Sequence, residues 1–162
     1  MQDNPPDYTV YVLVRNDLPS LNSGKAQAQV HHAGVQMAFK YHGSGLVQDY
    51  VNWGISQGAQ YFNTTIVLAA NLGQIRDVNL KCAFLDKDHV ISDQVIDPSY
   101  PFFVENAEIA GLIPQDDVTR IVHHMPDGRV CMVRPELTCA WYLGDRNNAE
   151  FRELFTGLSL HP

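Results

Sequence analysis

Apolar positions along the first half of the chain predict strands and helices in alternation. Residues 8–15 (YTVYVLVR) and 64–70 (TTIVLAA) are rich in β-branched and aromatic side chains, as buried strands are. Between them, apolar residues recur from Val30 to Tyr41 at the three- and four-residue steps of one helical face. A second helix is expected over residues 46–56.

The alternation continues beyond residue 70. Asn71 can cap a helix whose apolar residues follow at helical spacing, and residues 89–97 (HVISDQVID) alternate as a strand does. Asn22 or Ser23 is the expected cap of the first helix. The order strand, helix, helix, strand, helix, strand is typical of βαβ units and predicts a mostly parallel sheet.

The pattern becomes irregular after residue 97. Residues 98–117 contain three prolines and four acidic residues but no basic one, so a surface excursion is expected. Residues 119–135 (TRIVHHMPDGRVCMVRP) predict a β-hairpin that turns at Pro126-Asp127-Gly128. Residues 137–144 (LTCAWYLG) predict the last strand, and a short helix is expected over residues 147–155.

These elements predict one α/β domain over residues 8–162, after a flexible tail at residues 1–7. Its sheet is expected to be mixed but mostly parallel, with four strands and with helices on both faces. Residues 98–136, including the hairpin, would be an insertion near the C-terminal edge of that sheet.

Composition narrows the classes of function. The chain has 162 residues, of which 45% are apolar and 18% charged, as in ordinary globular proteins. A net charge of −7 argues against binding nucleic acid through a generally basic surface. It leaves room for a local basic patch, and Arg120, Arg129 and Arg134 lie together on the predicted hairpin.

The location of the protein is also suggested by its composition. The sequence shows no signal peptide and no apolar run long enough to span a membrane, so we expect a cytoplasmic protein without a membrane partner. Cys82, Cys131 and Cys139 are odd in number and share no CxxC spacing. They are expected to be reduced core thiols, with a thiol nucleophile as the alternative.

The histidines do not suggest a metal site. His31 and His32 are neighbours on a helix, and His123 and His124 are neighbours on a strand, so neither pair shares a face. No HExxH motif occurs in the sequence. We expect neither a metal nor a cofactor.

Lys25 occupies an unusual position. It falls in the first turn of a predicted helix, where the macrodipole disfavours a cation by up to about 1 kcal/mol. A lysine after glycine at a strand–helix turn can hold phosphate, as in nucleotide-dependent enzymes, but Pro19 and Ala26 replace the glycine and the Ser or Thr of a P-loop. The alternative is a solvated surface lysine.

The stretch around Lys25 resembles a known family. VLVRNDL…GKAQAQVHHAG is similar to the opening of the archaeal and eukaryotic type of peptidyl-tRNA hydrolase, V-V-R-x-D-L followed by G-K-I-A-A-Q-x-x-H-A-A. TTIVLAA resembles the second strand of that family, K-I-V-L-K-V. TCAWYLGDRNNAEFRELFTGLSLHP resembles its end, T-V-L-A-I-G-P, an acidic helix and V-T-G-x-L-K-L. The matching positions of the first motif are Arg15, Asp17, Leu18, Gly24, Lys25, Ala28, Gln29, His32 and Ala33.

One family motif is altered. The family follows its third strand with D-A-G-R-T-Q, whereas this chain has DPSYPF, so that Asp97 matches the aspartate and Arg-Thr-Gln is missing. About forty additional residues separate Asp97 from Thr138, which matches the threonine that opens the last strand of the family.

The resemblance implies hydrolysis of the ester between a peptide and the 3′ ribose of tRNA, with peptidyl-tRNA as partner and a homodimer as assembly. Lys25 would supply positive charge, Asp97 would face it as partner and base, Thr138 would position water or substrate, and His32 would shape the pocket. The residues that the resemblance implies in substrate binding are Arg15, Asp17 and Gln29. The clustered charge of Arg120, Arg129 and Arg134 on the predicted hairpin adds these three as expected contacts to the RNA.

The alternative is a non-catalytic binding or regulatory protein on the same fold, because the Arg-Thr-Gln motif is missing and the chain is acidic. Asp97 would then be a turn opener before Pro98. Asp93 becomes the candidate base if VIDPSY is aligned differently.

Overall fold

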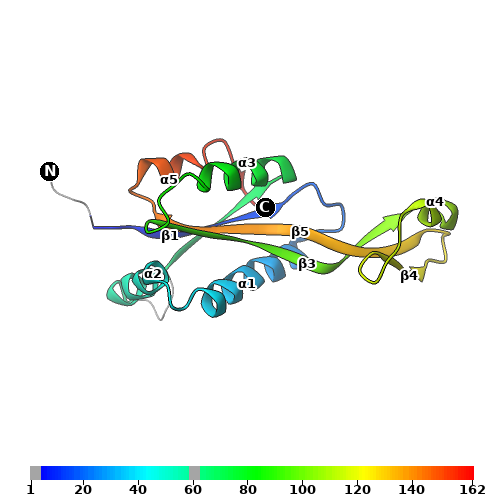
Figure 1. Ribbon diagram of the computed structural model, residues 1–162, viewed down its shortest axis with the longest axis horizontal. Helices are drawn as coiled ribbons and strands as arrows, with labels where there is room; N and C mark the ends of the chain where they lie inside the picture. The colour runs from blue at the N-terminus through cyan, green and yellow to red at the C-terminus, as the bar shows by residue number, and fades with distance from the viewer. Residues whose placement is uncertain (1–4, 59–62) are drawn as a thin grey trace.

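A computed structural model describes residues 5–58 and 63–162. Within these ranges a single six-stranded sheet is combined with five helices (Figure 1). The elements are β1 (Tyr8–Arg15), α1 (Ser23–Lys40), α2 (Gly45–Ser56), β2 (Thr64–Ala70), α3 (Leu72–Cys82), β3 (Val90–Val104), α4 (Ala107–Leu112), β4 (Arg120–His124), β5 (Val130–Asp145), α5 (Ala149–Glu153) and β6 (Ser159–Leu160).

The sheet is mixed, and the expectation of a four-stranded, mostly parallel sheet is wrong. The strand order is β3-β5-β1-β2-β6, and β4 pairs with β5 beyond this path. Only β1 and β2 form a parallel pair among the described strands, and every other pair is antiparallel. β1, β2 and β3 do run in one direction, but β5 lies between β1 and β3 and runs against both.

Helices cover both faces of the core sheet, as the alternating pattern predicts. Figure 1 shows α1 and α2 on one face and α3 and α5 on the other. The adjacent residues Trp141 and Tyr142 of β5 are both fully buried, in the clusters of opposite faces. The indole of Trp141 donates to Gln36 of α1 at 2.7 Å, and the hydroxyl of Tyr142 donates to Asn79 of α3 at 2.6 Å. The central strand is thus fixed to both helical layers.

The helix starts follow the capping residues in the sequence. The side chain of Asn22 accepts the Lys25 amide at 3.0 Å, which makes Asn22 the cap of α1. Asn71 caps α3 in a capping box with Gln74. The strands predicted at residues 8–15 and 64–70 are confirmed.

The segment 98–136, which we call the arm, differs from the expected surface excursion. β3 continues through Pro98 and Pro101 to Val104, and β5 is one strand that includes both the second half of the predicted hairpin and the predicted last strand. Prolines are tolerated here because β3 is an edge strand. The predicted hairpin between β4 and β5 is confirmed. Figure 1 shows the arm projecting from the core with α4 and β4 at its end.

The arm has a small core of its own. Val104, Ala110, Val130 and Met132 are buried together, and Phe102 packs against them. This cluster explains why α4 stays on the strands although it has only six residues.

The N-terminal segment is partly described. Residues 1–4 of the expected flexible tail lie outside the described residues. The amide of Asp7 donates to Asp145 at 2.8 Å, and Arg146 donates to the carboxylate of Asp7 at 2.9 Å. The start of β1 is therefore tied to the end of β5. In the described ranges, no helix combines the length and the apolar character that crossing a membrane requires.

Substitution of Gly144 tests the packing between β5 and α5. A Cβ at Gly144 would lie 2.9 Å from ring atoms of Phe151, which is fully buried. Gly144→Ala should therefore lower the free energy of unfolding by about 1–3 kcal/mol, measured by urea denaturation. Gly34→Ala in α1 has open space around its Cβ and should raise stability by about 0.5–1 kcal/mol. Equal stabilities of the two variants would contradict this packing.

Candidate functional site

A buried guanidinium marks the end of β1. Arg15 is only 5% exposed. It donates to Asp17, to Glu136 Oε1 at 3.0 Å and to the Leu137 carbonyl at 2.9 Å. Asp17 also accepts the amide of Leu72, the first residue of α3, at 3.3 Å. Of the implied substrate-binding residues, Arg15 is thus engaged inside the fold, and the exposed Asp17 is held by it; together they join β1, β5 and α3.

The network also determines the ionisation of Asp17. Burial alone would raise its pKa, but the hydrogen bonds from Arg15 and from the Leu72 amide outweigh burial. The pKa of Asp17 consequently lies below its ordinary value, and the carboxylate stays charged at neutral pH.

Two residues that match the first and the last motif of the family contact each other where α1 packs against β5. Gln29 is buried on the face of α1 that packs against the sheet, and Thr138 of β5 is fully buried. The Thr138 hydroxyl lies 2.7 Å from Gln29 Oε1 and 3.2 Å from the Val95 carbonyl. Because Thr138 is closed off from solvent, its hydroxyl positions α1 and does not itself contact a substrate.

Lys25 lies beside an aromatic ring. It is half-buried in the first turn of α1, and its ammonium lies 5.8 Å from the centroid of the Tyr100 ring. Within the described ranges it forms no ion pair. A cation over an aromatic face gains about 0.5–1 kcal/mol, which offsets the helix-dipole cost. The charge of Lys25 therefore remains available to a ligand.

The expected pairing of Asp97 with Lys25 is not formed. Asp97 is half-buried at an irregularity of β3, and its carboxylate accepts the Ser99 amide at 2.9 Å. This Asx turn directs one oxygen to the local backbone. Asp97 still lies on the same stretch of β3 as Val95, which contacts Thr138, and Tyr100, which contacts Lys25.

Two further candidate residues, His32 and Asp93, lie at different places in the structure. His32 is exposed on the same side of α1 as Lys25 and Gln29, since the three are spaced by four and three residues. Asp93, the alternative base, accepts hydrogen bonds from Lys40 at 2.6 Å and Tyr41 at 2.9 Å. Burial would raise the pKa of Asp93, but these bonds outweigh burial and lower the pKa. Asp93 is therefore a weak base held in an ion pair.

The cysteines and histidines do not build a reactive centre. Burial raises the pKa of the Cys139 thiol to about 12, so the thiolate is scarce at neutral pH. Cys82 is buried as well, and Cys131 is half-buried. Across residues 5–58 and 63–162, no three histidine, cysteine or acidic side chains are grouped as metal ligands.

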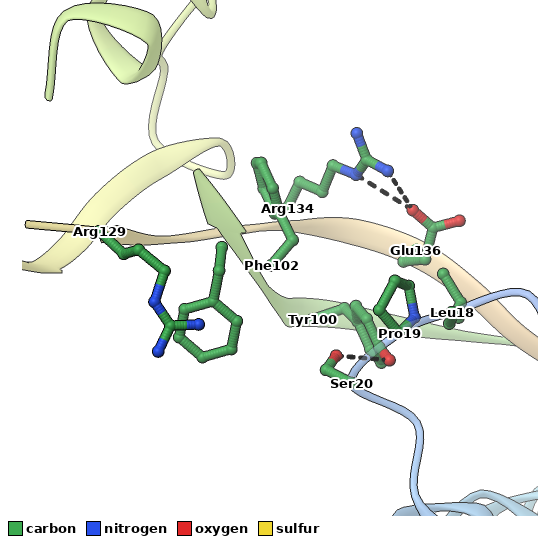
Figure 2. A pocket seen from close by; sticks show the side chains of 9 residues that line it. Leu18, Pro19, Ser20, Tyr100, Phe102, Arg129, Arg134 and Glu136 are labelled. Carbon is green, nitrogen blue, oxygen red and sulfur yellow. Dashed lines mark hydrogen bonds and ion pairs between the residues drawn. The ribbon is translucent and has the colours of Figure 1, made fainter. Parts of the chain in front are cut away.

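A cleft of about 470 Å³ lies where the arm leaves the core (Figure 2). The loop between β1 and α1 forms one wall, and β3 and β5 of the arm form the rest. Figure 2 shows the hydrogen bond between Ser20 and Tyr100 and the contact of Arg134 with Glu136. The lining residues are Leu18, Pro19, Ser20, Tyr100, Phe102, Phe103, Arg129, Arg134 and Glu136.

Two guanidinium groups of the cleft lie over aromatic rings. Arg134 is 4.8 Å from the centroid of the Phe102 ring, and Arg129 is 5.3 Å from that of Phe103. Arg120, the third arginine of the predicted hairpin, does not line the cleft and donates to the Asp117 carbonyl. The structure therefore separates Arg120 from the two cleft arginines.

Sequence reasoning missed the residues that connect the cleft with Lys25. Tyr100 lines the cleft and also contacts Lys25, and its hydroxyl is 2.7 Å from Ser20. The alternation of Tyr100, Phe102 and Val104 is a strand signal, but the prolines of the same segment concealed it.

Comparisons with known proteins add no assignment. No protein-family model matches the chain, and no curated protein matches its sequence. The geometry and the motif resemblance therefore carry the functional argument.

Removal of the Arg15 guanidinium tests the network at the end of β1. Arg15→Met leaves Asp17 and Glu136 without their buried partner, so unfolding should cost about 3 kcal/mol less at pH 7. Because the pKa of Asp17 is depressed in the folded state, the stabilisation is complete above about pH 4 and is lost as pH falls through the folded pKa.

The stability difference between wild type and Arg15→Met should therefore narrow in acid, measured by urea unfolding at pH 7 and pH 3. Arg76→Met, on the exposed side of α3, serves as control and should change stability by less than about 0.5 kcal/mol. If Arg15→Met lowers the free energy of unfolding equally at pH 7 and pH 3, the loss of stability comes from lost packing and not from lost ion pairs.

Proposed function

We propose that this protein hydrolyses the ester bond that joins a peptide to the 3′ ribose of tRNA. One observation carries the proposal: Gln29 and Thr138, which match the family motif from segments 109 residues apart in sequence, lie in direct contact at 2.7 Å. Lys25, the charged residue of the same motif, precedes Gln29 by one helical turn. A chance similarity of two short segments gives no reason for such a contact.

The chemistry needs a stabilised carbonyl oxygen, an activated water and a proton for the departing ribose oxygen. The ammonium of Lys25 is half-buried and unpaired within the described residues, so it can stabilise negative charge that develops on the carbonyl oxygen. Asp97 is the carboxylate on the neighbouring stretch of β3. It takes a proton from the attacking water and returns it to the departing ribose oxygen.

The other motif residues act indirectly in this mechanism. Thr138 and Gln29 fix the position of α1 on the sheet and thus the position of Lys25. His32 lies two turns further along the same side of the helix and forms the rim of the site. The cleft residues Tyr100, Arg129 and Arg134 come from the arm, which stands in place of the missing Arg-Thr-Gln motif.

A non-catalytic binding protein is the second candidate, and one observation favours it. The cleft of about 470 Å³ lies at the root of the arm, and neither Lys25 nor Asp97 lines it. A protein that binds acylated RNA without cleaving it would need that cleft and not the lysine.

An assay for peptide release from N-blocked aminoacyl-tRNA separates the two candidates. The hydrolase should release the blocked amino acid with multiple turnovers, and the binding protein should retain the intact ester. Release should proceed unchanged with EDTA, because the proposed chemistry uses only side chains.

Lys25→Ala should lower the rate of ester hydrolysis by about 10²–10³-fold, as expected for loss of a charge that stabilises the transition state. The fold should be retained, because the helix cap uses the backbone amide of residue 25 and the side chain of Asn22. The single-turnover rate measures the effect. Lys81→Ala, in the last turn of α3, is the control and should hydrolyse at the wild-type rate. A folded, fully active Lys25→Ala variant would exclude the lysine.

Asp97→Asn should lower the rate constant of hydrolysis by about 10²-fold while KM stays nearly constant, because the general base is lost. Asparagine can keep the turn to Ser99, so the structure of β3 should not change. Asp93→Asn weakens the contact to Lys40 and should reduce stability without a comparable loss of rate. The reverse pattern, with Asp93→Asn inactive and Asp97→Asn active, would assign the base to Asp93.

A further inference from the structure

The cleft at the root of the arm combines the two features that bind single-stranded nucleic acid. Three aromatic residues, Tyr100, Phe102 and Phe103, line it together with two arginines. Unstacked bases bind to aromatic side chains, and neighbouring phosphates bind to guanidinium groups. Phe103 is 49% exposed, which leaves ring surface open to a ligand.

The two arginines of the cleft differ in freedom. Arg129 pairs with Asp127 at 2.7 Å, and both side chains are about half exposed, so the pair is weak and a phosphate can replace the carboxylate. Arg134 pairs with Glu136, which is only 12% exposed and is also held by Arg15. Arg134 is as exposed as Arg129, but it pairs with a carboxylate that the core also holds. Arg129 pairs only with the exposed Asp127 and is therefore the more available phosphate ligand.

The charge of the arm restricts the direction from which RNA can approach. Glu105 precedes α4 and Glu108 lies in its first turn. Two more acidic residues, Asp116 and Asp117, lie between α4 and β4. No basic residue stands between residues 98 and 119, so this acidic segment repels a phosphate backbone, whereas Arg120 and Arg129 of the hairpin attract it. The cleft, which Arg129 and Arg134 line, is therefore a part of the arm that a phosphate backbone can approach.

The cleft also adjoins the proposed reaction centre. Tyr100 forms part of its lining and carries the Lys25 ammonium 5.8 Å from its ring centroid. Only the side chain of Tyr100 would thus separate an RNA end bound in the cleft from the ammonium of Lys25.

We propose that this cleft holds the unpaired nucleotides at the 3′ end of the acylated RNA, with a base stacked on Phe103 and a phosphate bound by Arg129. The inference rests on the proposed function for the identity of the RNA. It assigns the arm insertion as the element that recognises the single-stranded end.

Binding of non-acylated RNA tests the inference separately from hydrolysis. The probe is an RNA minihelix with a short unpaired 3′ tail, compared with the same duplex with a blunt end, by fluorescence anisotropy across a salt series. The tailed RNA should bind more tightly than the blunt one. Phe103→Ala and Phe103→Leu should each weaken binding of the tailed RNA by about tenfold, and the leucine variant keeps an apolar side chain in the arm.

The charge variants should change affinity in opposite directions. Arg129→Gln should weaken binding and reduce the slope of log affinity against log salt by about one. Asp127→Asn releases Arg129, keeps an acceptor for its amide, and should strengthen binding several-fold. Arg76→Gln, on the exposed side of α3 and outside the cleft, is the control and should leave affinity and slope nearly unchanged.

The possible outcomes are distinct. Equal binding of blunt and tailed RNA, equal effects of Arg76→Gln and Arg129→Gln, or no RNA binding would overturn the inference. An effect of Phe103→Ala on the KM of peptide-bearing substrates alone would assign the cleft to the peptide and overturn it too. Tail-dependent binding with the expected variant pattern, but without hydrolysis by the wild type, would support the cleft and overturn the proposed hydrolase.

Discussion

The antiparallel insertion of β5 between β1 and β3 is the constraint on which the rest of the structure depends. This strand pairs with β1 on one side and β3 on the other, and its outer half pairs with β4. Its core half supplies Trp141 and Tyr142 to opposite helical layers. Its middle supplies Glu136 and Thr138, which contact Arg15 and Gln29. Core, arm and candidate site are therefore aligned by one continuous backbone.

The junction between core and arm owes its shape to two polar contacts of this strand. The Arg15 guanidinium is satisfied by Asp17, Glu136 and a carbonyl, so that it can be buried at the end of β1 without an unpaired charge. Glu136 in turn also accepts Arg134. A chain of alternating charges thus runs from the core into the cleft and orients the arginine that covers Phe102.

Much of the fold could be predicted from local pattern. The strands at residues 8–15 and 64–70 were visible because β-branched runs are bounded by turn residues, and Asn71 marked the start of α3. Strand order could not be predicted, since alternating elements do not reveal that a strand from the end of the chain enters the centre of the sheet. The length of β3 was underestimated because proline is rarely found within a strand except at the edge of a sheet. Whether a strand lies at the edge depends on the tertiary structure and cannot be read from its own sequence.

The candidate site was predictable only in part for a related reason. The motif residues Lys25, Gln29 and Thr138 could be selected by resemblance, and two of them are in contact. The cleft could not be foreseen, because it is built from the β1–α1 loop and from strands about eighty to one hundred and fifteen residues away in sequence. The partner of Lys25 was misassigned for the same reason: Tyr100 reaches it only after the irregularity of β3 that follows Asp97.

The late position of β5 in the chain has a consequence for biosynthesis. Tyr8 of β1 pairs with Asp145, so the antiparallel neighbour of the first strand leaves the ribosome 137 residues after Tyr8. Until then β1 and β2 form a two-stranded ribbon with both edges open, and β3 has no partner in the sheet. Contacts of such long sequence separation slow folding and keep apolar strands exposed. β1 and β3 consequently gain their shared neighbour only after β5 has been synthesised, and until then the early strands depend on α1, α2 and α3 for cover.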